Sequence, residues 1–328
     1  MVIISVKSTS INVDDVALAQ DSAGGGWFFH TRKPTPDSPL VGGLEYAGVV
    51  LAVGPKTKSL KVGDRVCGIQ DAISNSSTGT WAEQTSAPES HVVPIPDSVS
   101  FLEAATSGMC AFVSGDMYNR AKLSIDEKAE AARCLVIGAS GGLGTAMLKL
   151  LSSHKGKRPH VTAVCSETNF DLVKRLGAQE AVNYKEGPIE LQLAEKEKFD
   201  VVFDFFGGAE SEKATLLLKG GGKFITAVGP MSALGDRVLS CWEWHSWCCG
   251  LTGRICKGSL PCAKYSYEMA GGMPPMKAAQ FNEVVVDAGF RAEVALEVPF
   301  EEGQIREALR RVASRHTSGK VVINMERS

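Results

Sequence analysis

The sequence predicts an α/β protein whose main sheet is parallel and doubly wound, with helices on both faces. Three observations favour this fold class. Short runs rich in Val and Ile, separated by Gly, Pro, Asn and Ser clusters, occupy the first hundred residues. From about residue 133, apolar strands alternate with helical patterns, which is typical of βαβ units. A glycine-rich turn, Gly138–Gly144, joins the first of these strands to the first of these helices.

Composition limits the classes of function. The chain has 328 residues, with 35 Lys+Arg against 37 Asp+Glu and a net charge of −2. At roughly 150 residues per domain this length indicates two domains. The balanced charge argues against a nucleic-acid binder. No apolar run reaches the roughly 18 residues of a membrane span. The first residues also lack the features of a signal peptide. Nine cysteines form no disulfide framework, so we expect a soluble, reduced protein of the cytoplasm or of an organelle.

The individual elements follow in order along the chain. Strands are expected at 2–6, 47–53 and 91–95 in the first part. The second part is expected to have strands at 134–137, 160–165, 182–184, 201–205 and 223–228, with helices at 143–151, 169–176, 189–196 and 209–218. A strand at 292–299, a helix at 304–313 and a strand at 320–325 close the chain. Residues 240–262, which are rich in Trp and Cys, show no clear period.

The glycine-rich turn is the motif that carries chemistry. It has Gly-x-x-Gly-x-x-Gly spacing, follows a strand and opens a helix. Glycines permit the tight turn, the close approach of a pyrophosphate and close packing of helix on strand. The helix N-terminus offers N–H groups and a positive dipole to the phosphates. The motif therefore predicts a dinucleotide site, the alternative being a purely structural turn.

The end of the second strand of this alternation indicates which dinucleotide binds. An Asp or Glu there would bind the ribose hydroxyls and repel a 2′-phosphate. Ser166 stands at this position and Glu167 follows it. A serine hydroxyl can donate to a phosphate, so we expect NADPH rather than NADH. The alternative role of Glu167 is a solvated residue at a helix start.

Several segments together carry a family resemblance. They run in order along nearly the whole chain: 10–16, 43–50, 61–66, 80–83, 138–144, 176–178, 183–184, 199–204 and 318–322. With them the chain resembles the zinc-free branch of the medium-chain dehydrogenase/reductase superfamily, and within it the NADPH:quinone oxidoreductases and their reticulon-interacting relatives.

The resemblance implies two domains with the cofactor between them. A GroES-like barrel would comprise residues 1–105 and 273–328, and a Rossmann domain residues 106–272. Carried over by position, the cofactor contacts would be Ser140, Gly141, Gly142, Leu143 and Gly144 at the pyrophosphate, Ser166 and Tyr184 at the adenosine end, Phe206, Gly207, Val228 and Gly229 at the nicotinamide, and Gly319 and Lys320 from the other domain. It also implies a homodimer.

Zinc is not expected. Zinc-dependent members of this superfamily use Cys and His ligands, the His within Gly-His-Glu. Here Leu44 stands between Gly43 and Glu45, and Asn12 stands where the cysteine would be. Leu cannot ligate Zn²⁺ and Asn is a poor ligand. The late cysteines 248, 249, 256 and 262 have no paired C-x-x-C spacing, so we expect no metal site.

A zinc-free site favours particular acceptors. Reducing an isolated carbonyl without a Lewis acid is difficult, because the alkoxide needs stabilisation. Hydride addition to a quinone or an α,β-unsaturated carbonyl spreads the charge, and hydrogen-bond donors and water can complete proton delivery. Asn12 is the catalytic candidate, orienting substrate or nicotinamide. Its alternative role is to cap a turn after a strand.

Other features stay open at the level of sequence. Residues 27–30 (Trp27, Phe28, Phe29, His30) lie where family members build one wall of the substrate pocket, although their order differs. Val113 stands where the family has a threonine near the nicotinamide, with Ser114 beside it. The alternatives in function are an enoyl-thioester reductase and a catalytically weak NADPH-binding scaffold. The compartment is expected to be the cytoplasm, or a mitochondrion or plastid if a targeting peptide precedes this chain.

Overall fold

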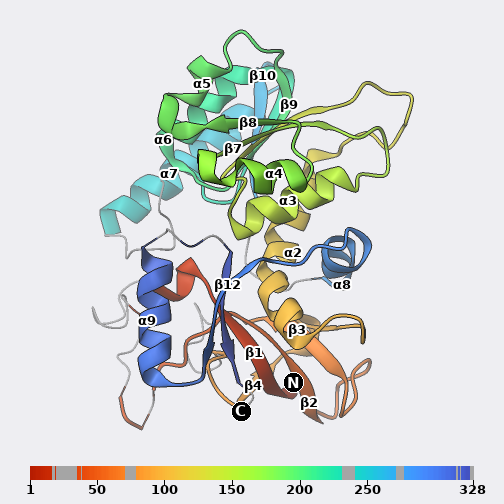
Figure 1. Cartoon of the computed structure of the whole chain (residues 1–328), viewed down its shortest axis with the longest axis vertical. Helices are drawn as coiled ribbons and strands as arrows, with labels where there is room; N and C mark the ends of the chain where they lie inside the picture. The colour runs from red at the N-terminus through yellow and green to blue at the C-terminus, as the bar shows by residue number, and fades with distance from the viewer. Residues whose placement is uncertain are drawn as a thin grey trace.

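The structure is a computed structural model that describes residues 1–16, 19, 35–37, 39–70, 79–230, 241–270, 277–314, 317 and 319–325. It contains two sheets, one in each half of the molecule (Figure 1). The two termini lie in the same half, below the parallel sheet in this view. No helix among these residues is long and apolar enough to cross a bilayer.

The first sheet combines strands from both ends of the chain. Its members are β1 (Val2–Ile11), β2 (Glu45–Val53), β3 (Arg65–Ile69), β4 (Gln84–Ala87), β5 (Val92–Pro94), β12 (Val294–Pro299) and β13 (Lys320–Asn324). Their order is β12-β13-β1-β2-β3-β5, and β4 also pairs with β1. β1 and β13 are antiparallel, with Thr9 opposite Ile323. The C-terminal strand, helix and strand thus return to the first part of the chain, and the helix is α9 (Glu302–Ala313).

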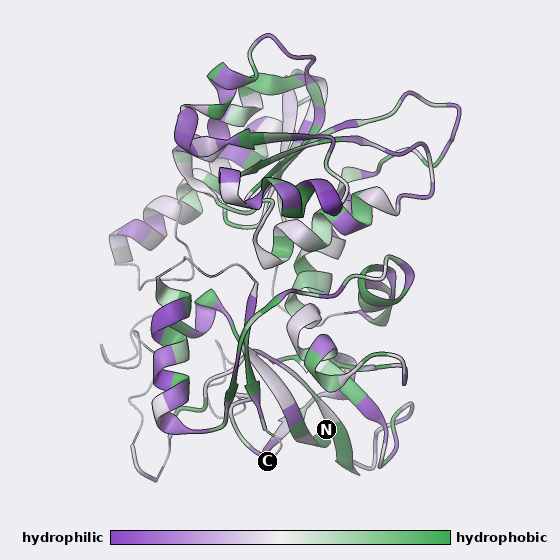
Figure 2. Cartoon of the chain, viewed as in Figure 1, coloured by the Kyte–Doolittle hydropathy of each residue, from purple (hydrophilic) through white to green (hydrophobic). Residues whose placement is uncertain are grey.

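The second sheet is parallel throughout. Its strands are β6 (Arg133–Ile137), β7 (His160–Cys165), β8 (Glu180–Asn183), β9 (Phe199–Asp204), β10 (Leu218–Thr226) and β11 (Tyr265–Met269), in the order β11-β10-β9-β6-β7-β8. The chain moves outward from β6 in both directions, so the carboxyl ends of β6 and β9 form the switch point where ligands of such sheets bind. The predicted doubly wound α/β class is confirmed. The strand residues are largely apolar, as a sheet covered on both faces requires (Figure 2).

Short helices connect these strands. They are α3 (Gly142–Ser152), α4 (Phe170–Arg175), α5 (Ile189–Gln192) and α6 (Gly208–Glu212), with 3₁₀ turns at Glu167–Asn169, Tyr184–Glu186 and Lys213–Leu217. A further 3₁₀ turn, Glu89–His91, precedes β5 in the first sheet. The helices expected at 189–196 and 209–218 are therefore shorter than their sequence patterns indicate. In the second case the chain tightens from α6 into a 3₁₀ turn.

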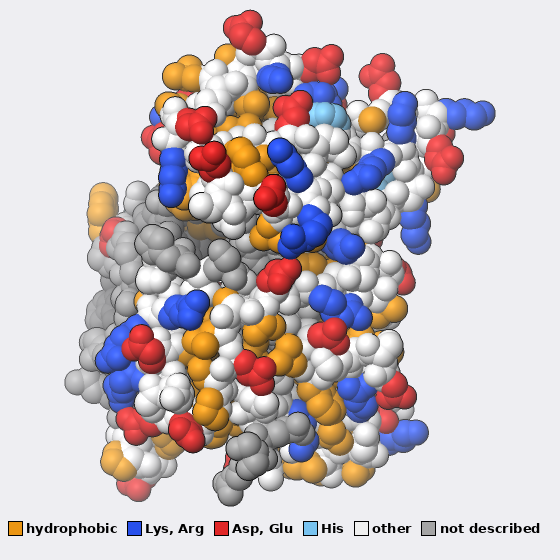
Figure 3. Space-filling view, in the orientation of Figure 1, with side chains coloured by type: hydrophobic (Ala, Val, Ile, Leu, Met, Phe, Trp, Pro, Cys, Tyr) orange, Lys and Arg blue, Asp and Glu red, His pale blue; other side chains and the backbone are white. Residues whose placement is uncertain are grey.

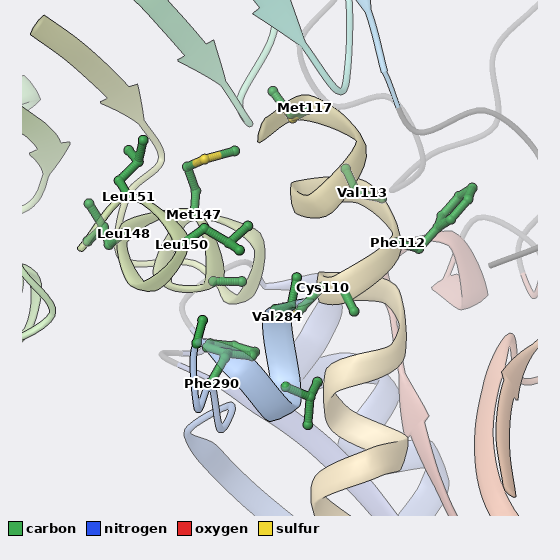
Figure 4. Close-up of a cluster of buried hydrophobic side chains, with 14 of the residues drawn as sticks. Cys110, Phe112, Val113, Met117, Met147, Leu148, Leu150, Leu151, Val284 and Phe290 are labelled. Atoms are coloured by element: carbon green, nitrogen blue, oxygen red, sulfur yellow. The ribbon is translucent and has the colours of Figure 1, made fainter. Parts of the chain in front are cut away.

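A long helix that the sequence pattern did not reveal links the two halves. α2 (Phe101–Ala121) begins with a capping box, in which Ser100 and Glu103 exchange hydrogen bonds. Its residues are buried on most sides, so it lacks a single apolar stripe. α2 packs against α3 and against α8 (Ala278–Phe281), which continues as a π-helical segment, Asn282–Asp287. Figure 4 shows this core, to which Cys110 and Val113 of α2, Met147 of α3 and Val284 all belong.

The Trp- and Cys-rich segment is also helical. Residues 240–262 were expected to lack a regular period, but α7 spans Cys241–Gly258. Trp247 is buried on its inner side, and Leu251 and Ile255 pack partly buried against the core of the parallel sheet. Three glycines and two small polar residues, Ser246 and Thr252, interrupt the apolar pattern of this helix, which explains why the sequence pattern was weak.

Candidate functional site

The glycine-rich turn adopts the geometry expected of a phosphate-binding loop. Gly138 has a φ of +77°, which favours glycine. A Cβ on Gly144 would lie 2.2 Å from the Gly138 carbonyl oxygen, so the third glycine permits close packing of α3 on the turn. Gly141 is the N-cap of α3 and offers no side-chain hydrogen bond. The first-turn N–H groups of α3, from Gly142 onward, therefore remain available to a ligand such as a pyrophosphate.

A cluster of polar side chains lies where the sequence predicts the adenosine end of the cofactor. Ser166 directly follows β7, as predicted. The Asn169 amide donates to Ser166 Oγ at 3.0 Å and to Ser140 Oγ at 3.2 Å, which brings the glycine turn and the end of β7 together. Tyr184 directly follows β8 and is half exposed. Cys165 lies opposite Asn183 in the sheet, so Ser166 and Tyr184 leave adjacent strands at the same edge.

A cavity of about 220 Å³ lies beside the glycine turn. It is lined by Ser140, Gly142, Thr145, Leu172, Arg175, Ala292, Glu293 and Gly319, which come from both halves of the molecule. Across it, Arg175 and Glu293 form an exposed ion pair at 3.7 Å. Basic and acidic side chains lie close together where the two halves meet (Figure 3). Three of the predicted cofactor residues, Ser140, Gly142 and Gly319, line this cavity. The remaining lining residues were not predicted, because they come from helices and loops that carry no sequence motif.

The turns after β9 and β10 pack against each other. Phe206 is half exposed in the first turn. Gly207 has a φ of +77°, and a Cβ there would lie 2.6 Å from Val228 in the second turn. Gly208 N–H donates to the Gly229 carbonyl at 2.9 Å. The four residues predicted to line the nicotinamide thus lie in two turns that pack together, with Phe206 exposed and Gly207 and Gly229 buried.

A buried ion pair lies where the two halves meet. Lys320 Nζ lies 2.5 Å from Glu45 Oε1 and 2.5 Å from Asn12 Oδ1. The same carboxylate oxygen accepts from Asn12 Nδ2 at 3.1 Å and from the Ser10 hydroxyl, and Glu45 Oε2 accepts from Met109 N–H at 2.7 Å. Glu45 is fully buried. The Asn12 amide, the catalytic candidate, is therefore hydrogen-bonded at both its oxygen and its nitrogen within this network.

The charge of Lys320 is stabilised by its surroundings. Burial is the largest single effect and acts to lower the pKa of its ammonium, but the charge and hydrogen bond of Glu45 together with the nearby Cys110 and Asp15 outweigh it, so the net pKa is raised. The Lys320 stem also lies against the glycine turn, since a Cβ on Gly142 would be 3.5 Å from Lys320 Cδ. The Lys320 stem therefore reaches the glycine turn, while its ammonium is bound to Glu45, and its predicted contact with the cofactor stays a prediction. Glu45 was not predicted as a site residue. In the sequence it appeared only as the last residue of the Gly43–Glu45 segment that was compared with Gly-His-Glu.

Asp15 fixes the backbone around Asn12. Its carboxylate accepts from Asn12 N–H at 2.8 Å and from Gly43 N–H at 3.0 Å. Burial raises the pKa of this carboxyl from 3.8 to about 7, despite the lowering effect of both hydrogen bonds. The Asp15 side chain thus holds together the two segments that flank the ion pair.

The metal-ligand positions contain no ligand set in the described ranges. Leu44 is buried. Burial raises the pKa of the Cys110 thiol to about 12, and the pKa of the Cys67 thiol is raised as well, so both stay protonated. Among the residues described, no three His, Cys, Asp or Glu side chains are grouped to hold a metal ion. On α7, the Cys249 thiol lies 3.6 Å from His245 Nε2.

Two further predictions concern the nicotinamide region. Val113 is buried, and the Ser114 hydroxyl donates to the Leu143 carbonyl at 2.8 Å, within the first turn of α3. The hydroxyl that was considered a substitute for the family threonine therefore bonds the glycine-turn helix. The residues Trp27, Phe28, Phe29 and His30 lie outside the described part of the chain.

Two family models match this chain, and several known oxidoreductases are similar to it. The alcohol dehydrogenase GroES-like domain matches residues 1–97, and the zinc-binding dehydrogenase domain matches residues 176–323. The mitochondrial NAD(P)H oxidoreductase RTN4IP1 of Danio rerio is 30% identical over 335 residues, which cover 99% of this chain and 83% of that protein. A chloroplastic NADPH-dependent alkenal/one oxidoreductase of Arabidopsis thaliana is 30% identical over 241 residues, 73% of this chain and 58% of that protein.

Solved structures agree on the fold. A quinone oxidoreductase from Coxiella burnetii superposes with a TM-score of 0.72 at 18% identity, over 99% of this chain and 90% of that one. The relationship to RTN4IP1 covers nearly the full length of this chain, including the glycine turn, and 83% of that protein. The chain therefore belongs to the medium-chain dehydrogenase/reductase superfamily, an oxidoreductase family that uses a nicotinamide cofactor, as a relative of RTN4IP1.

Proposed function

We propose that this chain is a zinc-independent, NADPH-dependent reductase that acts on quinones or α,β-unsaturated carbonyls. The observation that carries the proposal is the glycine turn, which opens α3 with free N–H groups and borders a cavity lined from both halves of the molecule. These features fit a dinucleotide, because the N–H groups suit a pyrophosphate and the glycines leave room for its approach.

We propose that this chain's own residues divide the binding of NADPH among them. The pyrophosphate would lie on Ser140, Gly141, Gly142, Leu143 and Gly144, the adenosine end on Ser166 and Tyr184, and the nicotinamide on Phe206, Gly207, Val228 and Gly229, with Gly319 and Lys320 contributed by the other half. When bound, the reduced nicotinamide supplies a hydride. The Ser166 hydroxyl, held by Asn169, can donate to a 2′-phosphate, whereas a carboxylate there would repel it.

The acceptor class follows from the groups around the cleft. Lys320 and Asn12 are polar, but both are bound to Glu45, so neither replaces a metal ion as a strong Lewis acid. An acceptor that delocalises the incoming charge, such as an enone or a quinone, needs less help. The name of the alkenal/one relative supports this class. Asn12 would act by orienting the substrate or the nicotinamide.

A panel assay tests the proposal. The purified chain is given NADPH or NADH with a quinone, an enone, an enoyl-CoA or a saturated aldehyde, and cofactor oxidation is followed. We expect turnover with quinones or enones and with NADPH in preference to NADH, and stoichiometric zinc should be absent by elemental analysis. Preferred turnover of enoyl-CoA would indicate a thioester reductase, and NADPH binding without turnover would indicate a scaffold.

We also propose the remaining assignments as expectations. One domain comprises residues 1–105 with 273–328, and the other comprises residues 106–272. The protein is a homodimer, and light scattering would test this by a mass of two chains.

The compartment is the cytoplasm, with a mitochondrion or plastid as the alternative; the names of two relatives include these organelles. Microscopy of the tagged product of the complete gene would decide between them.

A further inference from the structure

The Asp204 carboxylate anchors the first of the two turns assigned to the nicotinamide. Asp204 is the last residue of β9 and is fully buried. Its Oδ1 accepts from Phe206 N–H and from Gly207 N–H, both at 3.0 Å. The turn therefore folds back over the carboxylate, and Phe206 is left half exposed instead of packing into the core.

The second turn is anchored to the same carboxylate through a hydroxyl. Thr226 is the last residue of β10 and lies opposite Asp204 in the sheet. Its hydroxyl donates to Asp204 Oδ2 at 2.8 Å and accepts from Val228 N–H at 3.1 Å and Gly229 N–H at 2.9 Å. Because the Thr226 oxygen receives two N–H groups, its own proton must point to an acceptor, which the carboxylate supplies.

The direction of these hydrogen bonds requires a side chain at position 204 that only accepts. A carboxylate only accepts, so it can serve the two N–H groups of the first turn and the hydroxyl of Thr226 at once. Burial raises the pKa of Asp204, and its hydrogen bonds act to lower it; the Ser211 hydroxyl is a further partner. α7 supports the second turn from outside, since Trp247 Nε1–H donates to the Val228 carbonyl at 3.2 Å.

We propose that Asp204 and Thr226 are positioning residues that together set the two turns against which the nicotinamide ring lies. This inference rests on the proposed function and deepens it, because it names what holds the nicotinamide wall in place. Neither side chain touches the cofactor; each acts through the backbone of residues 206–207 and 228–229. The adenosine end, held by Asn169, is anchored separately.

Three substitutions separate this role from general stability. Asp204→Asn keeps the shape, but its amide N–H₂ would face the Thr226 hydroxyl, which already accepts two N–H groups. Thr226→Val removes the hydroxyl at similar volume. Thr226→Ser retains it and is the matched control. Dissociation constants are measured for NADPH and for 2′-phospho-ADP-ribose, which carries the adenosine end and pyrophosphate but no nicotinamide, with thermal unfolding followed in parallel.

We expect Asp204→Asn and Thr226→Val to weaken NADPH binding by about tenfold, because each leaves buried polar groups unpaired. Binding of 2′-phospho-ADP-ribose should stay within about twofold, and Thr226→Ser should leave both constants unchanged. Equal weakening of both ligands, or no effect on either, would overturn the proposal. If Asp204→Asn does not fold, the Thr226→Val and Thr226→Ser pair gives the same comparison. Failure of the wild-type protein to bind either ligand would overturn the proposed function itself, and this inference with it.

Discussion

Lys320 and Glu45 stand 275 residues apart in the sequence, and their side chains form a buried ion pair with an Nζ–Oε1 distance of 2.5 Å. The pair joins the last strand of the chain to β2, beside the glycine turn on which a dinucleotide would lie. Removing one charge of a buried ion pair is destabilising, because the other is left uncompensated in the interior, whereas removing both charges need not be.

Removing one partner of this pair should therefore be costly. We expect Lys320→Met to lower the free energy of unfolding by about 3–5 kcal/mol, and the double variant Lys320→Met/Glu45→Gln to recover most of that loss. Urea denaturation would measure both. Lys219→Met is the matched control, because Lys219 pairs with Asp200 at 2.9 Å on the surface and should cost no more than about 1 kcal/mol. Equal losses for the buried and exposed lysines would contradict the account.

Replacing Asn12 should lower the rate of the reaction more than replacing Ser10, which is hydrogen-bonded to the same Glu45 carboxylate. Asn12→Ala removes an acceptor from Lys320 and a donor from Glu45, so we expect kcat/KM to fall by about tenfold. Ser10→Ala removes one hydrogen bond to the same carboxylate and a long one, at 3.4 Å, from the Asn12 amide, but it leaves the contacts of Lys320 in place. It should lower stability without a comparable loss of rate. Steady-state kinetics of both variants would decide, and an unchanged kcat/KM for Asn12→Ala would exclude Asn12 from the site.

Cofactor preference should change with the residue after β7. Ser166→Asp places a carboxylate where the 2′-phosphate would lie and offers an acceptor to ribose hydroxyls. We expect the ratio of kcat/KM for NADPH over NADH to fall by about 100-fold. Ser166→Ala, which removes only the hydroxyl, should shift the ratio much less. A Ser166→Asp enzyme that keeps its preference for NADPH would show that the 2′-phosphate lies elsewhere.

Two glycines of the turn should tolerate alanine very differently. A Cβ on Gly144 would lie 2.2 Å from a backbone oxygen, whereas a Cβ on Gly142 would meet its nearest atoms at 3.5 Å. We expect Gly144→Ala to lower the free energy of unfolding by about 2–3 kcal/mol through displacement of α3. Gly142→Ala should leave stability within about 1 kcal/mol of the wild type. Thermal and urea unfolding of both variants test this, and similar losses would count against the close packing described.

Asp15 should make stability depend on pH. Burial raises the pKa of its carboxyl from 3.8 to about 7, so between these values the folded chain holds a proton that the unfolded chain has released. The free energy of unfolding therefore falls as pH rises through this window, by about 1.4 kcal/mol per pH unit.

Asp15→Asn has no such proton to lose. Between pH 5 and pH 7 the wild type should lose about 2 kcal/mol relative to Asp15→Asn, measured by urea denaturation at each pH. A stability difference between the two proteins that stays constant with pH would show that Asp15 is ionised throughout the range.

Local patterns account for what the sequence could predict. The strand, glycine turn and helix around Gly138–Gly144 are contiguous in the chain, so their geometry follows from neighbouring residues. Ser166 was found in the same way, by its distance from that turn. The parallel sheet followed from the alternation of apolar runs, and the return of β13 to β1 came from the family resemblance.

The missed residues depend on contacts between distant positions. Asp204, Asn169 and Glu45 have ordinary local surroundings in the sequence, and their roles appear only when strand ends and turns come together. α2 escaped notice for a different reason. Its two halves are buried by different partners, which removes the one-sided apolar pattern by which helices are recognised.

The hydrogen bond from Trp247 to the Val228 carbonyl gives the molecule an optical reporter. An indole fixed in a buried position against one turn senses changes in polarity and hydrogen bonding at that turn, whereas Trp242, which is 77% exposed, senses mainly solvent. The difference in emission between the wild type and a Trp247→Phe variant therefore isolates the signal of the Val228–Gly229 turn, so that its response to each ligand can be followed without any added label.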